Sequence, residues 1–456
     1  MSGSPELTLG QAAEGPAPDS ERILAELERF GIKLGLETTR ELLAKLGNPQ
    51  CNYPVVLVSG TNGKGSTAAL IDSMIRAAGY RCGLFVSPHL ESPLERLSFN
   101  GGLISDAALA ALLERTVDVG RSHLGHSPSY FEALCVAALD WFDRNNAEVA
   151  VLEVGLGGRL DATNVCDPVL SIVTSVGLDH QQQLGETLAE IASEKAGILR
   201  SGRPVLTACG GVALEVIRSH AVQLGAPLEV VDPDDVNVVE EGLRGQVLEI
   251  RAPAGPYRLS VELAGEHQRE NIQLAVRACE ILADQGFDQL GRSAVEAGAS
   301  TCRWPGRCEL VELPTGGSVL LDVAHNTDGA RVLARFLSRH YSSYVLVFGA
   351  LEGKNSTGMV EALTADAVHV VLTRPPSTRA RAPVELKSVL HRAEGLAVEL
   401  AVVESPSRAL DYALDQAASW NGRTVVCGSL YLVGELRRVL SERFGVPTSA
   451  TVSTSD

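Results

Sequence analysis

Residues 55–79 read VVLVSGTNGKGSTAALIDSMIRAAG, an apolar run followed by a glycine-rich turn and then by a helical pattern. Such a turn between a strand and a helix exposes backbone N–H groups at a helix N-terminus, where the helix dipole adds about half a positive charge. Lys64 supplies a full charge for phosphate groups, and Ser66 supplies a hydroxyl for Mg²⁺. The spacing departs from G-x-x-x-x-G-K-[ST], because Val58 and Gly65 occupy its first glycine and its hydroxyl position. We interpret the segment as a nucleotide-binding phosphate loop; the alternative is a glycine turn that only closes a βα unit.

Apolar, β-branched runs recur along the chain and alternate with helical patterns, which is typical of parallel sheets built from βαβ units. These runs lie at 55–59, 149–154, 169–174, 204–207, 318–323, 344–348, 367–373 and 424–427. Residues 301–307 (TCRWPGR) carry Pro and Gly and predict a boundary. We therefore expect an α/β protein with a P-loop parallel-sheet ATPase domain at 21–303 and a smaller Rossmann-like α/β domain at 304–445. Residues 246–263 alternate apolar and polar and predict a β-hairpin insertion, and the tails at 1–20 and 446–456 are predicted to be disordered.

Composition excludes several classes of function. The 456 residues carry a net charge of −17, which argues against non-specific duplex binding, so we expect no nucleic-acid partner. No apolar run approaches a membrane span, and the first basic residue is Arg22, so neither a membrane segment nor a targeting peptide is expected. Nine cysteines form no CxxC pair. This pattern predicts a reduced cytoplasmic protein without disulfides or structural zinc.

Two further predicted strands end in side chains that suit hard cations. Glu153 lies near the end of an apolar run, and Asp179 and His180 follow the next run. Because ligands bind beyond the carboxyl ends of parallel strands, Ser66, Glu153 and His180 form a plausible shell around Mg²⁺ that bridges nucleotide phosphates. The alternative is structural: Glu153 in a buried ion pair with Arg159, and His180 satisfied by backbone groups.

Lys195 occupies an unusual position for a lysine. Residues 187–199 predict a helix, and Lys195 falls inside its apolar stripe, seven residues after Leu188 and four after Ile191. A lysine there must snorkel beside Glu194, pair, lose its proton or be chemically modified.

Several stretches together resemble one enzyme family, the folylpolyglutamate synthase/dihydrofolate synthase branch of the Mur-type ATP-dependent ligases. They run in family order from about residue 30 to 440: FGIKLGLE (30–37), LGNPQ (46–50), SGTNGKGS (59–66), SPHLESPLERLSFNG (87–101), EVGLGGRLDATN (153–164), TSVGLDHQQQLGETLAEIASEKAGI (174–198), GEHQRENIQLA (265–275), WPGRCE (304–309), LDVAHN (321–326) and GSLYLVGELR (428–437). The resemblance implies an ATP- and Mg²⁺-dependent ligase that joins a folate-type carboxylate to the amino group of L-glutamate. It also implies small-molecule substrates, and we expect a monomer.

The resemblance implies roles position by position. Nucleotide contacts are expected at Asn62, Gly63, Lys64, Gly65, Ser66, Asn271, Arg307 and Asp322. Magnesium ligands are expected at Ser66, Glu153 and His180, and catalytic roles at Lys64, at Lys195 in carbamylated form and at His325. The pterin pocket is expected at Ser129, Tyr130, Phe131, Leu160 and Asp161, and the glutamate side at His325 and Ser429.

The resemblance has gaps on the glutamate side. Residues 352–355 are EGKN where the family often has an acidic D-K-D-like segment, and Thr327 follows AHN where the family commonly has Pro. For His325 the structural alternative is that it caps the following helix.

Three questions of function stay open at this point. One rival is a Mur-type ligase with a non-folate acceptor, and another is a nucleotide-driven switch, although no N-K-x-D guanine-reading element is present. Dihydropteroate glutamylation and polyglutamate extension use the same chemistry and differ only in pocket shape, so the motifs do not separate them.

Overall fold

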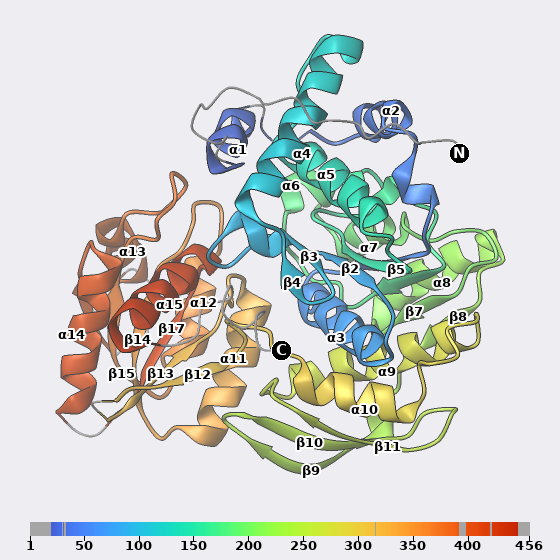
Figure 1. Cartoon of the computed structure of the whole chain (residues 1–456). Helices are drawn as coiled ribbons and strands as arrows, with labels where there is room; N and C mark the ends of the chain where they lie inside the picture. The colour runs from blue at the N-terminus through green and yellow to red at the C-terminus, as the bar shows by residue number, and fades with distance from the viewer. Residues whose placement is uncertain are drawn as a thin grey trace, which may run out of the picture.

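The computed structural model describes residues 20–29, 31, 33–314, 316–391, 398–419 and 422–445. Two α/β parts lie side by side, each with a sheet covered by helices on both faces (Figure 1). The expected tails at 1–20 and 446–456 lie outside the described residues, except for Ser20, which begins helix α1 (Ser20–Glu28). Within the described ranges, none of the helices combines the length and apolar character needed to cross a bilayer.

The first sheet has eight strands in the order β4-β3-β2-β5-β1-β6-β7-β8. Strands β2, β5, β1, β6, β7 and β8 run parallel, and β3 and β4 pair antiparallel at one edge. Strand β1 lies inside the sheet with all five residues buried, which explains its unbroken apolar sequence. The strands are β1 (Val55–Ser59), β2 (Cys82–Phe85), β3 (Leu97–Phe99), β4 (Gly102–Leu103), β5 (Val149–Glu153), β6 (Leu170–Val173), β7 (Val205–Thr207) and β8 (Leu228–Val230).

Alternate residues of each strand face opposite sides of this sheet. Because both faces carry apolar side chains, helices cover both. Val55 and Leu57 belong to one buried cluster, and Val56 and Val58 belong to the other. The first cluster packs α1, α2 (Glu37–Lys45), α4 (Asp106–Val119), α5 (Tyr130–Arg144), α7 (Leu188–Ala196) and α8 (Gly211–Leu224). The second packs α3 (Lys64–Ala77), α9 (His267–Ala283) and α10 (Arg292–Thr301). Helix α6 (Gln181–Leu184) is a single turn before α7.

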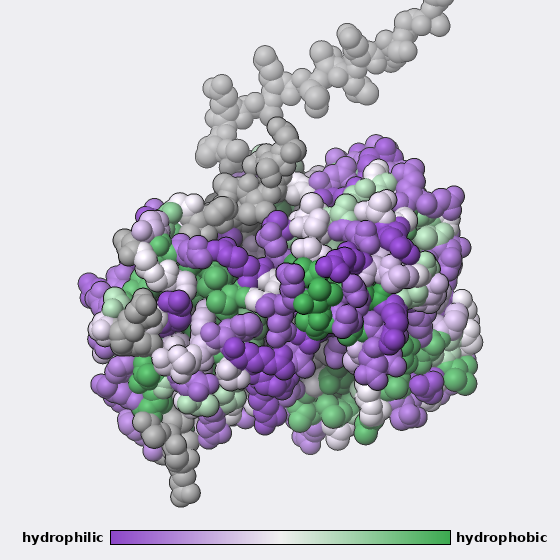
Figure 2. Space-filling view, turned by 90° about the horizontal axis from the view of Figure 1, so that it is seen from below, coloured by the Kyte–Doolittle hydropathy of each residue, from purple (hydrophilic) through white to green (hydrophobic). Residues whose placement is uncertain are grey.

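The predicted hairpin is present and is larger than expected. Strands β10 (Gly245–Ile250) and β11 (Tyr257–Val261) pair antiparallel, and β9 (Val236–Gly242) adds a third strand. The sequence did not predict β9, because its residues stay partly or fully exposed and show little apolar alternation. Seen from below, outside the grey atoms, the surface of the molecule is mainly hydrophilic, with separate apolar patches (Figure 2).

The second sheet has six strands in the order β12-β13-β17-β14-β15-β16, all parallel except β12. The strands are β12 (Glu309–Glu312), β13 (Ser318–Leu321), β14 (Tyr344–Phe348), β15 (Ala367–Leu372), β16 (Glu399–Val402) and β17 (Thr424–Cys427). One face packs against α11 (Thr327–His340), α12 (Ser356–Leu363) and α13 (Pro383–Leu390), and the other packs against α14 (Pro406–Ala418) and α15 (Leu430–Phe444). The predicted α/β fold class is confirmed.

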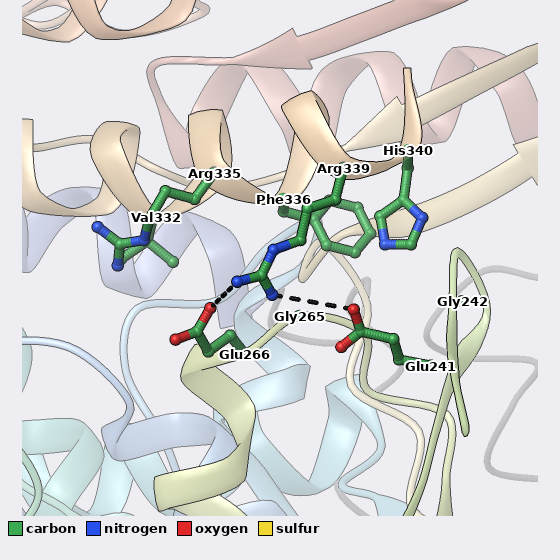
Figure 3. Close-up of a pocket in the computed structure, with 9 residues that line it drawn as sticks. All are labelled: Glu241, Gly242, Gly265, Glu266, Val332, Arg335, Phe336, Arg339 and His340. Carbon is green, nitrogen blue, oxygen red and sulfur yellow. Dashed lines mark ion pairs between the residues drawn. The ribbon is translucent and has the colours of Figure 1, made fainter. Parts of the chain in front are cut away.

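Ion pairs join the two α/β parts at some distance from the phosphate loop. Arg339 of α11 lies 2.8 Å from the carboxylate of Glu266 and 3.8 Å from that of Glu241 on β9 (Figure 3). The three-stranded insertion therefore contacts the second part through α11.

Candidate active site

The phosphate loop joins β1 to α3 at the centre of the first sheet. Gly63 has φ +87° and precedes Lys64, the first residue of α3, so the loop ends on the N-terminus of a 14-residue helix. The end of β6 holds the loop in place: Thr61 N donates to Ser175 O over 2.7 Å, and Thr174 Oγ1 donates to Asn62 O over 2.7 Å. A loop preformed beside a helix N-terminus suits phosphate binding.

Two glycines of the loop are closely packed by side chains of other elements. A Cβ on Gly63 would overlap the amide of Asn271 on α9, and a Cβ on Gly65 would lie 3.0 Å from the Trp304 ring and 3.3 Å from Glu153 Oε2. The structure therefore brings Asn271, one of the expected nucleotide contacts, to the phosphate loop. It also brings Trp304, which the sequence analysis noticed in the boundary segment and in the WPGRCE stretch but did not assign to the site.

Glu153 ends β5 beside the phosphate loop and is buried. Its Oε1 lies 4.0 Å from Lys64 Nζ, and its Oε2 accepts the Ser87 N–H over 3.0 Å. Burial raises the pKa of this carboxyl, while Lys64 and the Ser87 amide oppose the rise. Arg159 is not the partner of Glu153, because Arg159 pairs with Glu194 at 2.8 Å; Lys64 makes the buried ion pair with Glu153 instead.

The other expected magnesium ligands differ in their surroundings. Ser66 is buried in the first turn of α3. His180 has φ +51° and directly precedes α6. Desolvation lowers its pKa to about 4, Asp179 opposes the change, and the charges of Lys354, His325 and Lys64 add to it. Among the described residues there is no group of three His, Cys, Asp or Glu side chains that could hold a metal.

Ser87 is a residue that the sequence reasoning missed. Its hydroxyl is buried and has no hydrogen-bond partner among the described residues, and its N–H donates to Glu153. An orphan hydroxyl beside a buried carboxylate fits an oxygen ligand of Mg²⁺. No local signal in the sequence marked it: Ser87 follows the end of β2, and only the pairing of β2 with β5 places it beside Glu153.

Lys195 is buried in α7, as its place in the apolar stripe predicted. Its Nζ donates to Gly60 O in the phosphate loop over 2.8 Å. Burial lowers its pKa to about 7, and the nearby Lys64 adds to this effect. The alternative of snorkelling beside Glu194 is wrong. The helix is shorter than the predicted 187–199, and Leu188 at its start is exposed instead of lying in the stripe.

Asp179 of the first part meets three side chains of the second. Lys354 Nζ donates to Oδ1 over 2.6 Å, Asn326 Nδ2 donates to Oδ2 over 3.3 Å, and His325 Nε2 lies 3.7 Å from Oδ2. Although desolvation opposes it, His325 and Lys354 hold the pKa of Asp179 well below its usual range. Lys354 belongs to the EGKN segment, where the family resemblance was weakest.

His325 is free for a role other than capping. The cap of α11 is Asn326, whose Oδ1 accepts the Gly329 N–H over 2.8 Å, so the structural alternative for His325 is wrong. His325 Nδ1 lies 3.0 Å from Val323 O, which leaves Nε2 directed toward Asp179. Asn326 also donates to Asn62 Oδ1 over 3.2 Å and so ties this loop to the phosphate loop.

Ser429 lies next to the same loop. Gly428 N donates to Ala324 O over 2.9 Å, which brings residue 429 near His325. The Ser429 hydroxyl is buried, and no residue in the described ranges hydrogen-bonds to it. An unsatisfied buried hydroxyl next to this loop is suited to a polar substrate group.

Two of the expected nucleotide contacts lie near the junction of the two parts. Arg307 belongs to the linker, residues 302–308, and Asp322 follows β13 of the second part. Asp322 accepts the N–H groups of Ala324 and Cys308 over 2.8 and 2.9 Å, so its carboxylate shapes the linker backbone. Burial lowers the pKa of Arg307, while the charges of Asp322 and Glu153 oppose that change. Arg307 therefore lies within electrostatic reach of both parts of the molecule.

The residues expected at the pterin pocket fall into two groups. Ser129 forms a capping box with Glu132 at the start of α5, and Asp161 accepts the Leu156 and Thr163 N–H groups over 2.9 and 3.1 Å. Their polar atoms thus shape the backbone.

The remaining three present ring, apolar and backbone groups. Phe131 packs against Phe85 with ring centroids 5.7 Å apart, the Arg96 guanidinium lies 5.1 Å above the Tyr130 ring, and Leu160 O accepts the Gly35 N–H over 3.2 Å. Arg96 was not among the expected site residues.

Comparisons with known proteins define the class. Residues 58–279 match the Mur ligase middle domain, and residues 306–430 match the Mur ligase glutamate ligase domain. The chain is 34% identical over 425 residues to the dihydrofolate synthase/folylpolyglutamate synthase of Bacillus subtilis, covering 90% of this chain and 96% of that protein. The chain therefore belongs to the folylpolyglutamate synthase/dihydrofolate synthase family, and the predicted family is confirmed.

Two further proteins are similar to this chain. The chain is 37% identical over 433 residues to a probable bifunctional folylpolyglutamate synthase/dihydropteroate synthase of Haloferax volcanii, covering 92% of this chain and 50% of that protein. The chain thus spans about half the length of that relative. The Mycobacterium tuberculosis folylpolyglutamate synthase, solved with ADP and AMPPCP, superposes with a TM-score of 0.83 at 31% identity, covering 92% of this chain and 99% of that chain.

Proposed function

We propose that this protein is an ATP-dependent ligase that adds L-glutamate to a folate-type carboxylate. The proposal rests on one observation: side chains from both α/β parts meet beside the phosphate loop. The phosphate loop and Glu153 come from the first α/β part, while His325, Asn326 and Lys354 reach Asp179 and Asn62 from the second. The family comparisons give no support to a non-folate acceptor.

The proposed reaction has two steps. A carboxylate oxygen of the folate-type acceptor attacks the γ-phosphorus of ATP, ADP leaves, and an acyl phosphate forms. The glutamate nitrogen then attacks the acyl carbon, inorganic phosphate leaves, and the nitrogen loses a proton. Both steps depend on charge neutralisation and alignment, which Lys64, the phosphate-loop N–H groups and Arg307 would supply.

His325 and Ser429 are proposed to hold the glutamate side. His325 Nε2 faces Asp179, and the Ser429 hydroxyl is buried without a partner, so both have hydrogen-bonding capacity for an amino acid. His325 would orient the amine or accept its proton. An acyl phosphate hydrolyses in water, so contact between the two parts at Asp179 would also protect the intermediate.

Magnesium is proposed to bind Glu153 and His180 together with a serine hydroxyl. When bound, Mg²⁺ neutralises phosphate charge during transfer. Ser87 fits the hydroxyl role better than Ser66 does, because Ser87 Oγ is an orphan and its amide already holds Glu153. A carbamate on Lys195 would add an anion beside the phosphate loop.

The remaining proposals concern the domains, the oligomeric state, the location in the cell and the other binding residues. We propose that residues 21–303 and 304–445 form the two domains, that the protein acts as a monomer, and that it works in the cytoplasm. Asn271, Arg307 and Asp322 are proposed to serve the nucleotide, and Tyr130, Phe131 and Leu160, together with Ser129 and Asp161, the pterin substrate.

The proposal is tested with purified protein, ATP, Mg²⁺ and glutamate. Dihydropteroate and a reduced folate are offered separately, and mass spectrometry follows the addition of glutamate to each. We expect phosphate release in proportion to amide formed with at least one acceptor. ATP hydrolysis that needs no folate-type acceptor, or no amide with either acceptor, would contradict the proposal.

A further inference from the structure

The loop at 87–96, between β2 and β3, has a rigid frame and two ends that face the proposed site. The Glu95 carboxylate accepts the N–H groups of Leu90, Glu91 and Ser92 over 2.8 to 2.9 Å. At one end Ser87 holds Glu153. At the other end Arg96 donates to His89 Nδ1 over 2.9 Å and covers the Tyr130 ring. A shift of the loop would therefore move groups next to Glu153 and Tyr130 together.

Helix α15 of the second part holds this loop from outside. A Cβ on Gly434 would overlap the Leu90 carbonyl oxygen, so the helix approaches the loop at the distance that only glycine allows. The Leu90 side chain packs against the buried cluster beneath α14 and α15. One turn further along, Arg437 pairs with Glu91, and the Arg437 side chain is only 2% exposed.

Arg437 also reaches the linker between the two parts. Its Nε lies 3.0 Å from both carboxylate oxygens of Glu309, and Glu309 Oε2 accepts the Gly306 N–H over 2.8 Å. Gly306 directly precedes Arg307, which lies within electrostatic reach of Glu153. One buried guanidinium therefore binds both the loop that carries Ser87 and the linker that carries Arg307.

We propose that Gly434 and Arg437 are positioning residues of the ligase reaction. Gly434 and the Arg437–Glu91 pair set the place of the 87–96 loop, and the Arg437–Glu309 pair sets the place of Arg307. The inference rests on the proposed function, because it gives the two residues a part in that reaction. Removing one member of a buried ion pair leaves the other charge buried and unpaired, which is energetically costly. Loss of the Glu91 contact would therefore release the loop, and loss of the Glu309 contact would release the linker.

The kinetic test separates the contacts that hold the 87–96 loop from the contact that holds the linker. Glu91→Gln and Gly434→Ala disturb the loop alone, so we expect kcat to fall by on the order of 10- to 100-fold while the KM for ATP changes by less than about twofold. Arg437→Gln disturbs both the loop and the linker, so kcat falls and the KM for ATP rises by about tenfold. Arg437→Lys restores part of the activity. The control Arg438→Gln changes neither value, because Arg438 is half-exposed and pairs with Glu435 and Glu442 on its own helix.

A second readout does not depend on turnover. Hydrogen exchange of the full chain should be faster at the amides of residues 90–92 in Gly434→Ala and Glu91→Gln than in the wild type, with exchange in β14 unchanged. Unchanged exchange at 90–92, or kcat within about twofold of an active wild type in both variants, overturns this inference alone. An inactive wild type overturns the proposed function, and with it the part assigned to these two residues. Because Glu91→Gln adds no bulk, misfolding of Arg437→Gln or Gly434→Ala would still leave the inference testable.

Discussion

Replacing Lys195 by methionine should make the protein more stable at neutral pH and abolish its activity. The Lys195 ammonium is buried, and its pKa is lowered from 10.5 to about 7. The unfolded chain therefore binds more protons than the folded chain between these values, so stability rises with pH across that window. At pH 7 this difference destabilises the folded protein by about 4 kcal/mol, and at pH 9 by about 2 kcal/mol.

Methionine removes this penalty and keeps an unbranched apolar stem. It also leaves Gly60 O without the donor that Lys195 Nζ provides at 2.8 Å, which costs about 1 to 3 kcal/mol. The Lys195→Met variant should therefore be more stable than the wild type by on the order of 2 kcal/mol at pH 7. The advantage should shrink by about 2 kcal/mol by pH 9.

Chemical unfolding in CO₂-free buffer at pH 7 and pH 9 measures this difference, because CO₂ would convert the free amine to a carbamate. Lys387→Met is the matched control: Lys387 also donates to a carbonyl, Leu400 O at 2.9 Å, but is only partly buried. A stability difference for Lys195→Met that stays constant from pH 7 to pH 9 would refute the reasoning. Added bicarbonate should raise the activity of the wild type and leave Lys195→Met inactive, if the proposed carbamate serves the reaction.

Three further outcomes are expected from the site. Gly63→Ala should weaken ATP binding by at least tenfold in calorimetry, since a positive φ and a blocked Cβ position together displace the phosphate loop; tight binding by the variant would contradict this. Ser87→Ala should raise the Mg²⁺ concentration needed for half-maximal activity more than Ser66→Ala does, and the reverse order would assign the ligand to Ser66. Asp179→Asn should lower kcat about tenfold because the contact with Lys354 across the cleft weakens, and an unchanged kcat in stopped-flow turnover would exclude a role in closure.

Most elements of the fold were predictable because their signals are local. The run at 55–59 is apolar at every position and became an interior strand with all residues buried. The runs at 344–348 and 424–427 became strands with the predicted bounds. Strand β9 was not predicted because it is largely exposed and receives its structure from pairing with β10.

The candidate site was predictable in part. The phosphate loop and Glu153 lie in contiguous motifs, and a lysine in an apolar stripe marked Lys195 before its burial was known. Ser87 and Lys354 escaped notice, since their importance comes from what they face: a carboxylate on a neighbouring strand in one case, and an aspartate 175 residues away in the other.

The sequence by itself determined the class of fold, the phosphate loop and the family, because strand and helix periodicity and the spacing within a motif are properties of neighbouring residues. Only the tertiary structure decided which of two serines lies beside Glu153 with a free hydroxyl, that Arg159 serves Glu194, and that Asp179 receives groups from the second sheet. Such contacts join residues far apart in the chain. They depend on how the two sheets pack against each other, and no local pattern of residues encodes that packing.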